Sequence, residues 1–210
     1  LMGITPQRKR FDFALSILQE IQEKSPSTQL ILKGKLPKDF PWMKRRDQDN
    51  DWYEKLFESH RELFSQRIIL QEGFTPKIGS FFSTISTMLS VSDFESFHLA
   101  PAEGAAARTE VLMLSWTGAE EIHNSDWISD SISGLADKYL YSKSRGLNYE
   151  NGEVNREYVM ARYELRSIAF EMMSTISANV VRASHTKPPN LITTPSNTLL
   201  PHDTIQAERM

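Results

Sequence analysis

The sequence predicts an α/β fold in which a Rossmann-like parallel sheet carries helices on both faces. Short apolar runs of strand length alternate with segments of helical periodicity along most of the chain. The connections between these segments are only a few residues long, which is usual for neighbouring elements of a compact domain. Such an alternation is typical of parallel strands joined by crossover helices. Hydrophobic residues make up 40% of the 210 residues, enough for a substantial core.

Local patterns define the elements of the first half of the chain. Residues 1–4 are apolar and read as the end of a strand, whereas Phe11 and Leu15 recur on one face of a helix. Residues 30–35 form a compact strand of the buried type. The expected elements, in order, are a strand end over 1–4, a helix over 10–24, a strand over 30–35, a long polar loop over 37–50, a helix over 52–64 and a strand over 67–70.

The second half continues the alternation and then becomes helical. The expected elements are a helix over 75–85, a strand over 87–91, a helix over 101–107, a strand over 111–116, a helix over 126–141 and a long helix over 154–181. From residue 184 the composition shifts to Pro, Thr, Asn and Ser, which predicts a disordered tail. We therefore expect a Rossmann-like domain over 1–145, a C-terminal helical segment over 146–183 and the tail over 184–210.

Composition excludes several classes of function. The net charge of −3 gives no overall attraction to nucleic acid, and the absence of Cys excludes disulfides and thiolate metal sites. The five His lack metal-ligand spacing, so no metal is expected. No Walker loop is present, and no bound cofactor is expected either. No apolar run reaches the ~20 residues of a membrane span, and no signal peptide is visible. These features predict a cytoplasmic protein.

Two carboxylates flank the helix start after the strand over 87–91. Glu95 lies in the loop, and Pro101, which suits a first helical turn, places Glu103 in that turn. In an open α/β sheet, ligands bind at the carboxyl ends of strands, and helix N-termini attract phosphate. This setting favours a ligand that carries phosphate and hydroxyl groups. The residues alone leave open that Glu103 merely complements the helix dipole and that Glu95 is a solvated loop residue.

Basic residues are expected at the same edge of the sheet. Arg8, Lys9 and Arg10 follow the first strand, and Lys33 and Lys35 flank the end of the second. Because the carboxyl ends of parallel strands share one edge, these cations and the two glutamates could line one cleft. Such charge suits a diphosphate, particularly as a leaving group in the absence of a metal. The alternative is that residues 8–10 form a solvated charge run.

These motifs resemble the C-terminal, donor-binding domain of retaining glycosyltransferases of the GT-B fold, the glycosyltransferase group 1 family. The family's pair of glutamates separated by seven residues corresponds to the run ESFHLAPAEG, residues 95–104. The strands before and after it follow the family's order, and Gly3 and Lys9 match the family's Gly and the Lys six residues after it. The resemblance covers about residues 1–127, and its motifs are specific in combination.

The resemblance implies a role for each matching residue. Glu103 would bind the nucleotide ribose, Glu95 would contact the donor sugar and help to place its anomeric carbon, and Lys9 would neutralise the leaving diphosphate. The backbone around His98 and Leu99 would cradle phosphate. The other residues expected to bind the donor are Arg8, Phe97 and Lys35.

The resemblance implies one half of a two-domain transferase acting on a nucleotide-diphosphate sugar with retention of configuration. The chain opens inside a strand at Leu1, which suggests a fragment of a longer protein. A missing N-terminal domain would supply the site for a glycan or lipid-linked acceptor. The fragment alone would then be inactive, and peripheral membrane contact through the missing domain stays open.

Two other functions remain open. Ile4 replaces the Arg of the family pattern, and Ser96 and His98 replace its glycines, which suggests an inactive binding or regulatory module. A GT-B nucleotide-sugar epimerase is the third candidate.

Overall fold

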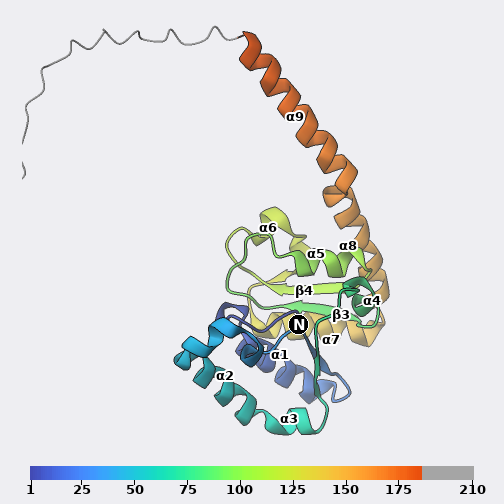
Figure 1. Ribbon diagram of the computed structural model, residues 1–210. Coiled ribbons are helices and arrows are strands. Elements are labelled where there is room, and N and C mark those ends of the chain that lie inside the picture. Colours follow the sequence, from blue (N-terminus) through green and yellow to red (C-terminus); the bar gives the residue numbers. More distant parts are fainter. Residues whose placement is uncertain (186–210) are drawn as a thin grey trace, which may run out of the picture. The chain divides into compact units, whose positions relative to one another are not determined.

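The computed structural model describes residues 1–185 and groups them into two compact units. The first unit, Leu1–Glu164, contains every strand of the described residues. The second begins at Leu165 with the helix α9 (Leu165–His185) (Figure 1). The tail predicted to be disordered falls almost wholly outside the described residues, since α9 reaches His185.

All strand pairs in the described part of the chain are parallel, as the sequence predicts. Strand β1 (Leu30–Lys33) pairs with β2 (Ile69–Glu72), and Met2 forms a parallel bridge to Lys33, which places the first residues beside β1. A second sheet has the order β3-β4-β5, with β3 (Thr87–Ser90), β4 (Glu110–Leu114) and β5 (Ile128–Ser129). The α/β prediction is therefore confirmed.

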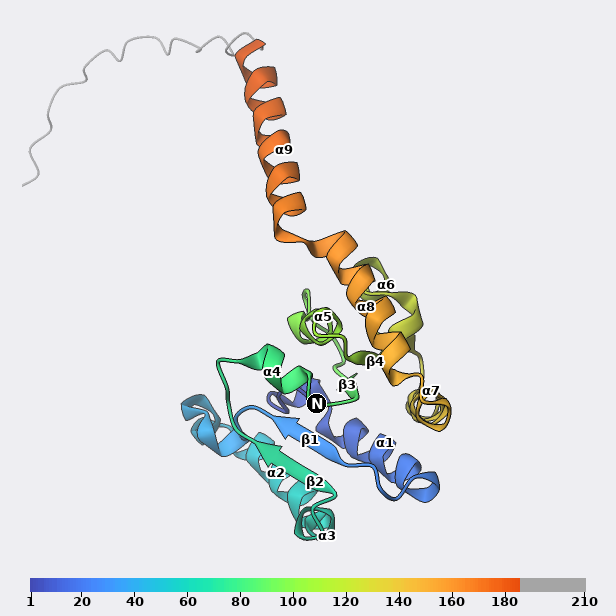
Figure 2. The same cartoon turned by 90° about the vertical axis from the view of Figure 1, so that its right-hand side faces the viewer.

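Helices cover both faces of the strands. On one side α1 (Phe11–Lys24) packs against α7 (Ile132–Arg145), and on the other α5 (Leu99–Ala106) packs against α8 (Asn148–Tyr163). Strands β3 and β4 lie between α5 and α7 (Figures 1 and 2). The short helix α4 (Ile78–Phe82) contacts α5.

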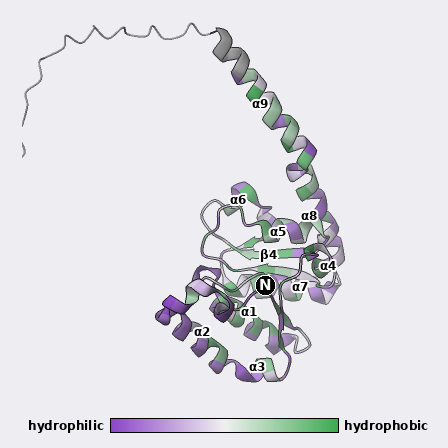
Figure 3. Ribbon diagram, viewed as in Figure 1, coloured by the Kyte–Doolittle hydropathy of each residue, from purple (hydrophilic) through white to green (hydrophobic). Residues whose placement is uncertain are grey.

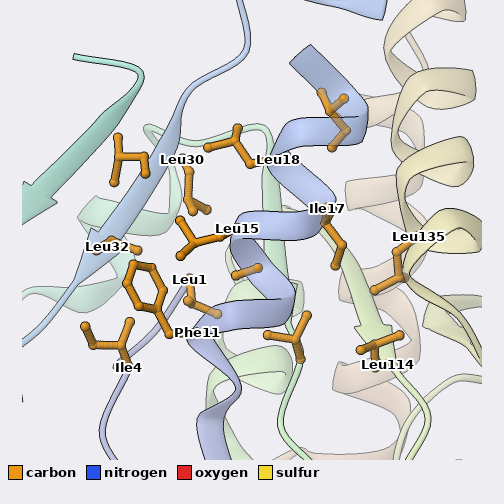
Figure 4. Close-up of a cluster of buried hydrophobic side chains, with 14 of the residues drawn as sticks. Leu1, Ile4, Phe11, Leu15, Ile17, Leu18, Leu30, Leu32, Leu114 and Leu135 are labelled. Carbon is orange, nitrogen blue, oxygen red and sulfur yellow. The ribbon is translucent and has the colours of Figure 1, made fainter. Parts of the chain in front are cut away.

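Alternate residues of β4 enter two different cores, as expected for a strand buried on both faces. Leu112 and Leu114 join the core formed with α1 and α7, whereas Val111 and Met113 join the core on the α5 side. Within the first core, Ile17 of α1 faces α7 while other α1 side chains face β1 (Figure 4). Figure 3 shows that the strands are largely hydrophobic, whereas the surface helix α2 (Asp47–Ser59) is largely hydrophilic.

Several predicted boundaries are wrong. The segment expected as a loop over 37–50 contains two 3-10 helices, η2 (Pro37–Asp39) and η3 (Pro41–Arg45), each begun by a proline whose fixed φ suits a first turn. Helix α2 starts within the same segment and is followed by α3 (Arg61–Ser65).

The sequence pattern also misses one strand. Residues 126–141 were expected to be helical, but the structure places η4 (Ser125–Trp127) and β5 there before α7 begins. Ser131 caps α7, its hydroxyl accepting a hydrogen bond from the Gly134 N–H at 3.1 Å. A strand of two residues is too short for alternation to be detected in the sequence. The remaining α-helix of the first unit is the four-residue α6 (Ala119–Ile122).

The long C-terminal helix is two helices. Glu164 has extended backbone angles (φ −64°, ψ 127°), and this separates α8 from α9. The expected domain boundary at residue 145 falls between α7 and α8, yet α8 packs on α5 and β4 within the first unit. Trp127 Nε1 donates to Asn155 Oδ1 at 2.6 Å and helps to hold α8 there.

We expect Gly152→Ala to destabilise the first unit strongly. A Cβ at position 152 would clash with the backbone oxygen of Arg108, so α8 would have to move away from the turn that precedes β4. Overpacking of this kind costs about 1–3 kcal/mol or more. The matched control is Gly79→Ala in α4, where a Cβ meets nothing within 4 Å. Thermal melting should show a lower Tm for Gly152→Ala only; equal Tm values for the two variants would contradict the packing described for α8.

Candidate functional site

Two loops meet at the carboxyl edge of the strands. One contains η1 (Gln7–Lys9), which follows the first residues of the chain, and the other follows β3. The Asp93 N–H donates to the Arg8 carbonyl at 2.8 Å, and Arg8 Nη1 donates to the Phe94 carbonyl, also at 2.8 Å. In open α/β sheets, ligands bind beside the loops at this edge.

A buried ion-pair cluster joins the two loops. Glu95 Oε2 lies 2.6 Å from Arg8 Nη1, and its Oε1 lies 2.5 Å from Lys9 Nζ. The Glu95 side chain is only 8% exposed. The alternatives of a solvated Glu95 and a solvated charge run are therefore wrong, and the structure brings together three of the residues expected at the donor site.

The two cations keep Glu95 ionised. Burial by itself raises the pKa of this carboxyl, but hydrogen bonds from Lys9 and Arg8 outweigh burial and lower the pKa to about 2. At neutral pH the carboxylate can accept hydrogen bonds, but it has no proton to donate.

His98 completes the cluster as a neutral group. It has a left-handed backbone (φ 56°) at the N-cap of α5, and its Nδ1 lies 3.1 Å from Ser90 Oγ. Its Nε2 lies 4.0 Å from Glu95 Oε1. Burial and the positive charge of Lys9 lower the pKa of His98 to about 4, although the charge of Glu95 acts in the opposite direction. The imidazole is therefore uncharged at pH 7.

The N-terminus of α5 lies directly beside this cluster. No side chain within residues 1–185 caps it, so the backbone N–H groups of Leu99 and Ala100 are available to an anion. Because α5 begins at Leu99, Pro101 is its third residue and Glu103 its fifth. The predicted place of Glu103 in the first turn is therefore wrong. Its side chain is exposed on the second turn, and it forms no ion pair with another described residue.

Other predicted residues lie outside the ion-pair cluster. Phe97 is half-buried, its ring centroid 5.1 Å from that of Tyr163 and 6.0 Å from that of His123. Leu99 is 63% exposed, and the role expected of it, phosphate binding, involves only its backbone N–H. Lys35 is exposed beyond the end of β1.

Two of the five cations expected at one cleft have other partners. Lys33 is buried, pairs with Glu72 at 3.1 Å and lies 4.6 Å over the Phe81 ring. Arg10 pairs with Asp12 and Asp93, both at 2.8 Å. The basic residues therefore do not all converge on Glu95.

Sequence reasoning missed Ser90 and Asp93, which support the cluster from β3 and its loop. Asp93 could have been found, because it lies in the same short loop as Glu95. Ser90 carries no such signal, since a serine in a strand is usually only a polar position on one face. Among residues 1–185 no three potential metal-ligating side chains cluster, and no helix is both long and apolar enough to cross a bilayer.

No protein-family model matches the sequence, and no curated protein does either. Solved structures do match. Anabaena HepE, determined in complex with UDP-glucose, has a TM-score of 0.68 and 14% identity over 84% of this chain and 47% of HepE. A mutant of S. aureus TarM, determined in complex with Fondaparinux, alpha-GlcNAc-glycerol and UDP, has a TM-score of 0.65 and 18% identity over 82% of this chain and 34% of TarM.

The C-terminal domain of the glycosyl transferase group 1 family protein LpcC from Francisella tularensis is similar over most of both chains. The TM-score is 0.63 with 19% identity, over 79% of this chain and 84% of that domain. This chain thus spans about a third to a half of TarM and HepE but most of an isolated C-terminal domain. It has the fold of a GT-B glycosyltransferase domain.

Proposed function

We propose that this chain binds a nucleotide-diphosphate sugar and forms the donor half of a retaining glycosyltransferase. The observation that carries the proposal is the convergence of Arg8 and Lys9 on Glu95 at the carboxyl edge of the strands, beside the uncapped N-terminus of α5. HepE, which has the same fold, was determined with UDP-glucose. A sugar with hydroxyls and a diphosphate needs both an acceptor carboxylate and positive charge.

Arg8 and Lys9 are assigned to the leaving group. When the bond between the anomeric carbon and the diphosphate oxygen breaks, both electrons stay on the oxygen and negative charge develops there. Cations fixed beforehand stabilise that charge more than they stabilise the ground state. Lys9 is 18% exposed and Arg8 33%, so both can reach a ligand at the surface of the cluster.

Glu95 is assigned to positioning of the sugar. Because its pKa is about 2, it is a carboxylate at neutral pH and cannot act as the general acid that protonates a leaving group. It can accept hydrogen bonds from sugar hydroxyls while it holds Arg8 and Lys9 in place. The N–H groups at the start of α5 would receive phosphate oxygens.

Transfer itself is proposed to require a second domain. The acceptor, a glycan or a lipid-linked glycan, would be bound there, in line with the fraction of TarM and HepE that this chain spans. No metal or resident cofactor is assigned a role in this proposal.

The first experiment is a thermal-shift titration with UDP, GDP, ADP and their sugar conjugates. A ligand that binds only the folded state raises the Tm according to its concentration and affinity. A shift with one nucleoside diphosphate identifies the base. No shift with any of them at millimolar concentration contradicts donor binding by this chain.

Glu103→Ala tests the role assigned to the second glutamate. We expect about a tenfold loss of nucleotide affinity, because one hydrogen bond from a ribose hydroxyl to a charged group is lost. The unfolding free energy should stay unchanged, since the side chain is exposed. Glu54→Ala, which changes another exposed glutamate, on α2, is the matched control. Equal affinities of the two variants would show that Glu103 does not contact the ribose.

A non-catalytic module is the second candidate. Ile4, at the position of the family's arginine, is 2% exposed and part of the core, so no cation is available there. A longer protein that contains this domain distinguishes the two functions. Glycosyl transfer that collapses in Glu103→Ala supports the enzyme, whereas partner binding without transfer supports the module.

A further inference from the structure

A short segment after β1 concentrates positive charge. Residues 35–46, here called the basic segment, contain five cations and one acid, although the whole chain has a net charge of −3. The cations are Lys35, Lys38, Lys44, Arg45 and Arg46. This charge is not used by the ion-pair cluster around Glu95.

The backbone of the basic segment is fixed to the core. Met43 is 1% exposed, and its carbonyl accepts a hydrogen bond from Asn50 Nδ2 at 2.9 Å. Pro37 is buried, and Asp39 Oδ2 accepts from the Leu36 N–H at 2.9 Å. The exposed side chains of η2 and η3 therefore extend from a scaffold that is already ordered.

An exposed indole lies among these cations. Trp42 is 42% exposed, and the Arg46 guanidinium lies 5.7 Å over its ring. The Phe40 ring centroid lies 5.6 Å from that of Trp42. Lys38, Lys44 and Arg45 are exposed, and none of them forms an ion pair with another residue in the described part of the chain.

We propose that the basic segment docks on an anionic lipid bilayer. Each Lys or Arg near such a surface adds to the electrostatic attraction. An indole side chain prefers the headgroup layer, where its apolar ring contacts the acyl chains and its N–H stays hydrated. The segment offers both groups on the neighbouring 3-10 helices η2 and η3. Of the two acids in the first turn of α2, the exposed Asp47 opposes binding, whereas Asp49 is buried and pairs with Arg46.

The basic segment and the candidate site are connected through the same part of the core. The basic segment leaves β1 at the carboxyl edge, and Tyr53 Oη donates to the Ile4 carbonyl at 2.6 Å, which ties α2 to the residues that precede η1. Met43 and Ile4 share one core. Docking would bring a lipid-linked acceptor to the same edge as Arg8 and Lys9, but membrane binding itself does not depend on donor binding.

Vesicle sedimentation with the full chain tests the proposal. The vesicles contain phosphatidylcholine with or without phosphatidylglycerol. The variant Lys38→Gln/Lys44→Gln should partition about 25-fold more weakly to the anionic vesicles, since each basic group contributes about a factor of five. Lys55→Gln/Lys77→Gln removes the same charge from two other exposed lysines and should partition like the unchanged protein. The other three Trp are less exposed, so Trp42 dominates any change in emission on binding.

Each outcome decides for or against the proposal. Binding that needs phosphatidylglycerol, falls only in the Lys38/Lys44 variant and is accompanied by quenching of Trp42 by brominated lipid supports it. Equal losses in both lysine variants, or equal binding to neutral vesicles, overturns it. Binding to heparin but not to vesicles would show a surface for soluble polyanions and would also overturn it.

Discussion

Lys9→Gln is expected to lower the affinity for a nucleoside diphosphate by about 10- to 100-fold. A hydrogen bond that involves a charged group contributes about 1.5–3 kcal/mol, which corresponds to that range. The amide of Gln can still contact Glu95, and Arg8 remains at 2.6 Å from that carboxylate, so the cluster should keep its shape. Calorimetric titration with the nucleotide identified by the thermal-shift screen measures the change.

The control for Lys9→Gln is Lys77→Gln, which removes one exposed lysine from the turn before α4. General electrostatic attraction would weaken binding equally in both variants and would disappear at high salt. Direct contact predicts a loss in Lys9→Gln alone that persists at about 0.5 M salt. A loss of the same size in Lys77→Gln would remove Lys9 from the proposed mechanism.

The parallel fold could be predicted because its signals are local. Strands buried on both faces are continuous apolar runs, as in β4, and α1 has a clear apolar stripe. The elements that were missed lack such signals. Strand β5 has two residues, and η2 and η3 are turns that packing of Pro37 and Met43 holds in place.

The candidate site could be predicted in part. Its topology places the loops after the first residues and after β3 together, and this follows from strand order alone. Which cations pair with Glu95 could not be predicted, because pairing depends on side-chain reach across two loops. Lys33 looked equivalent to Lys9 in the sequence, but Lys33 is buried and its partner, Glu72, lies opposite it on β2.

The start of α5 shows why one residue can move a predicted site. Pro101 suits the first position of a helix, so the sequence placed Glu103 in the first turn. A histidine with a positive φ is uncommon, yet His98 adopts one and begins the helix two residues earlier. Its burial beside Ser90 and Glu95 holds this backbone in place, which is a tertiary effect that local propensity does not contain.

Glu95→Gln is expected to lower the unfolding free energy at pH 7 by about 3 kcal/mol. The pKa of Glu95 falls from 4.5 in the unfolded chain to about 2 in the folded state, so ionisation of this carboxyl stabilises the folded protein. That stabilisation is fully present above the unfolded pKa of 4.5 and is lost as the pH falls toward 2. The variant leaves Arg8 and Lys9 without a counter-ion. A Tm decrease of roughly 6–12 °C at pH 7 follows for a domain of this size.

The pH dependence of the difference is the decisive measurement. The gap in unfolding free energy between the unchanged protein and Glu95→Gln should close between pH 4.5 and 2, where Glu95 itself becomes protonated. His98 acts at higher pH: in the unchanged protein its lowered pKa removes stability as the pH falls from 6.5 to about 4. In Glu95→Gln, which lacks the charge that raises the pKa of His98, this loss extends to lower pH. Glu103→Gln, exposed and outside the cluster, should leave the unfolding free energy at pH 7 unchanged. A gap that stays constant from pH 7 to pH 2 would show that the negative charge of Glu95 does not hold the two loops together.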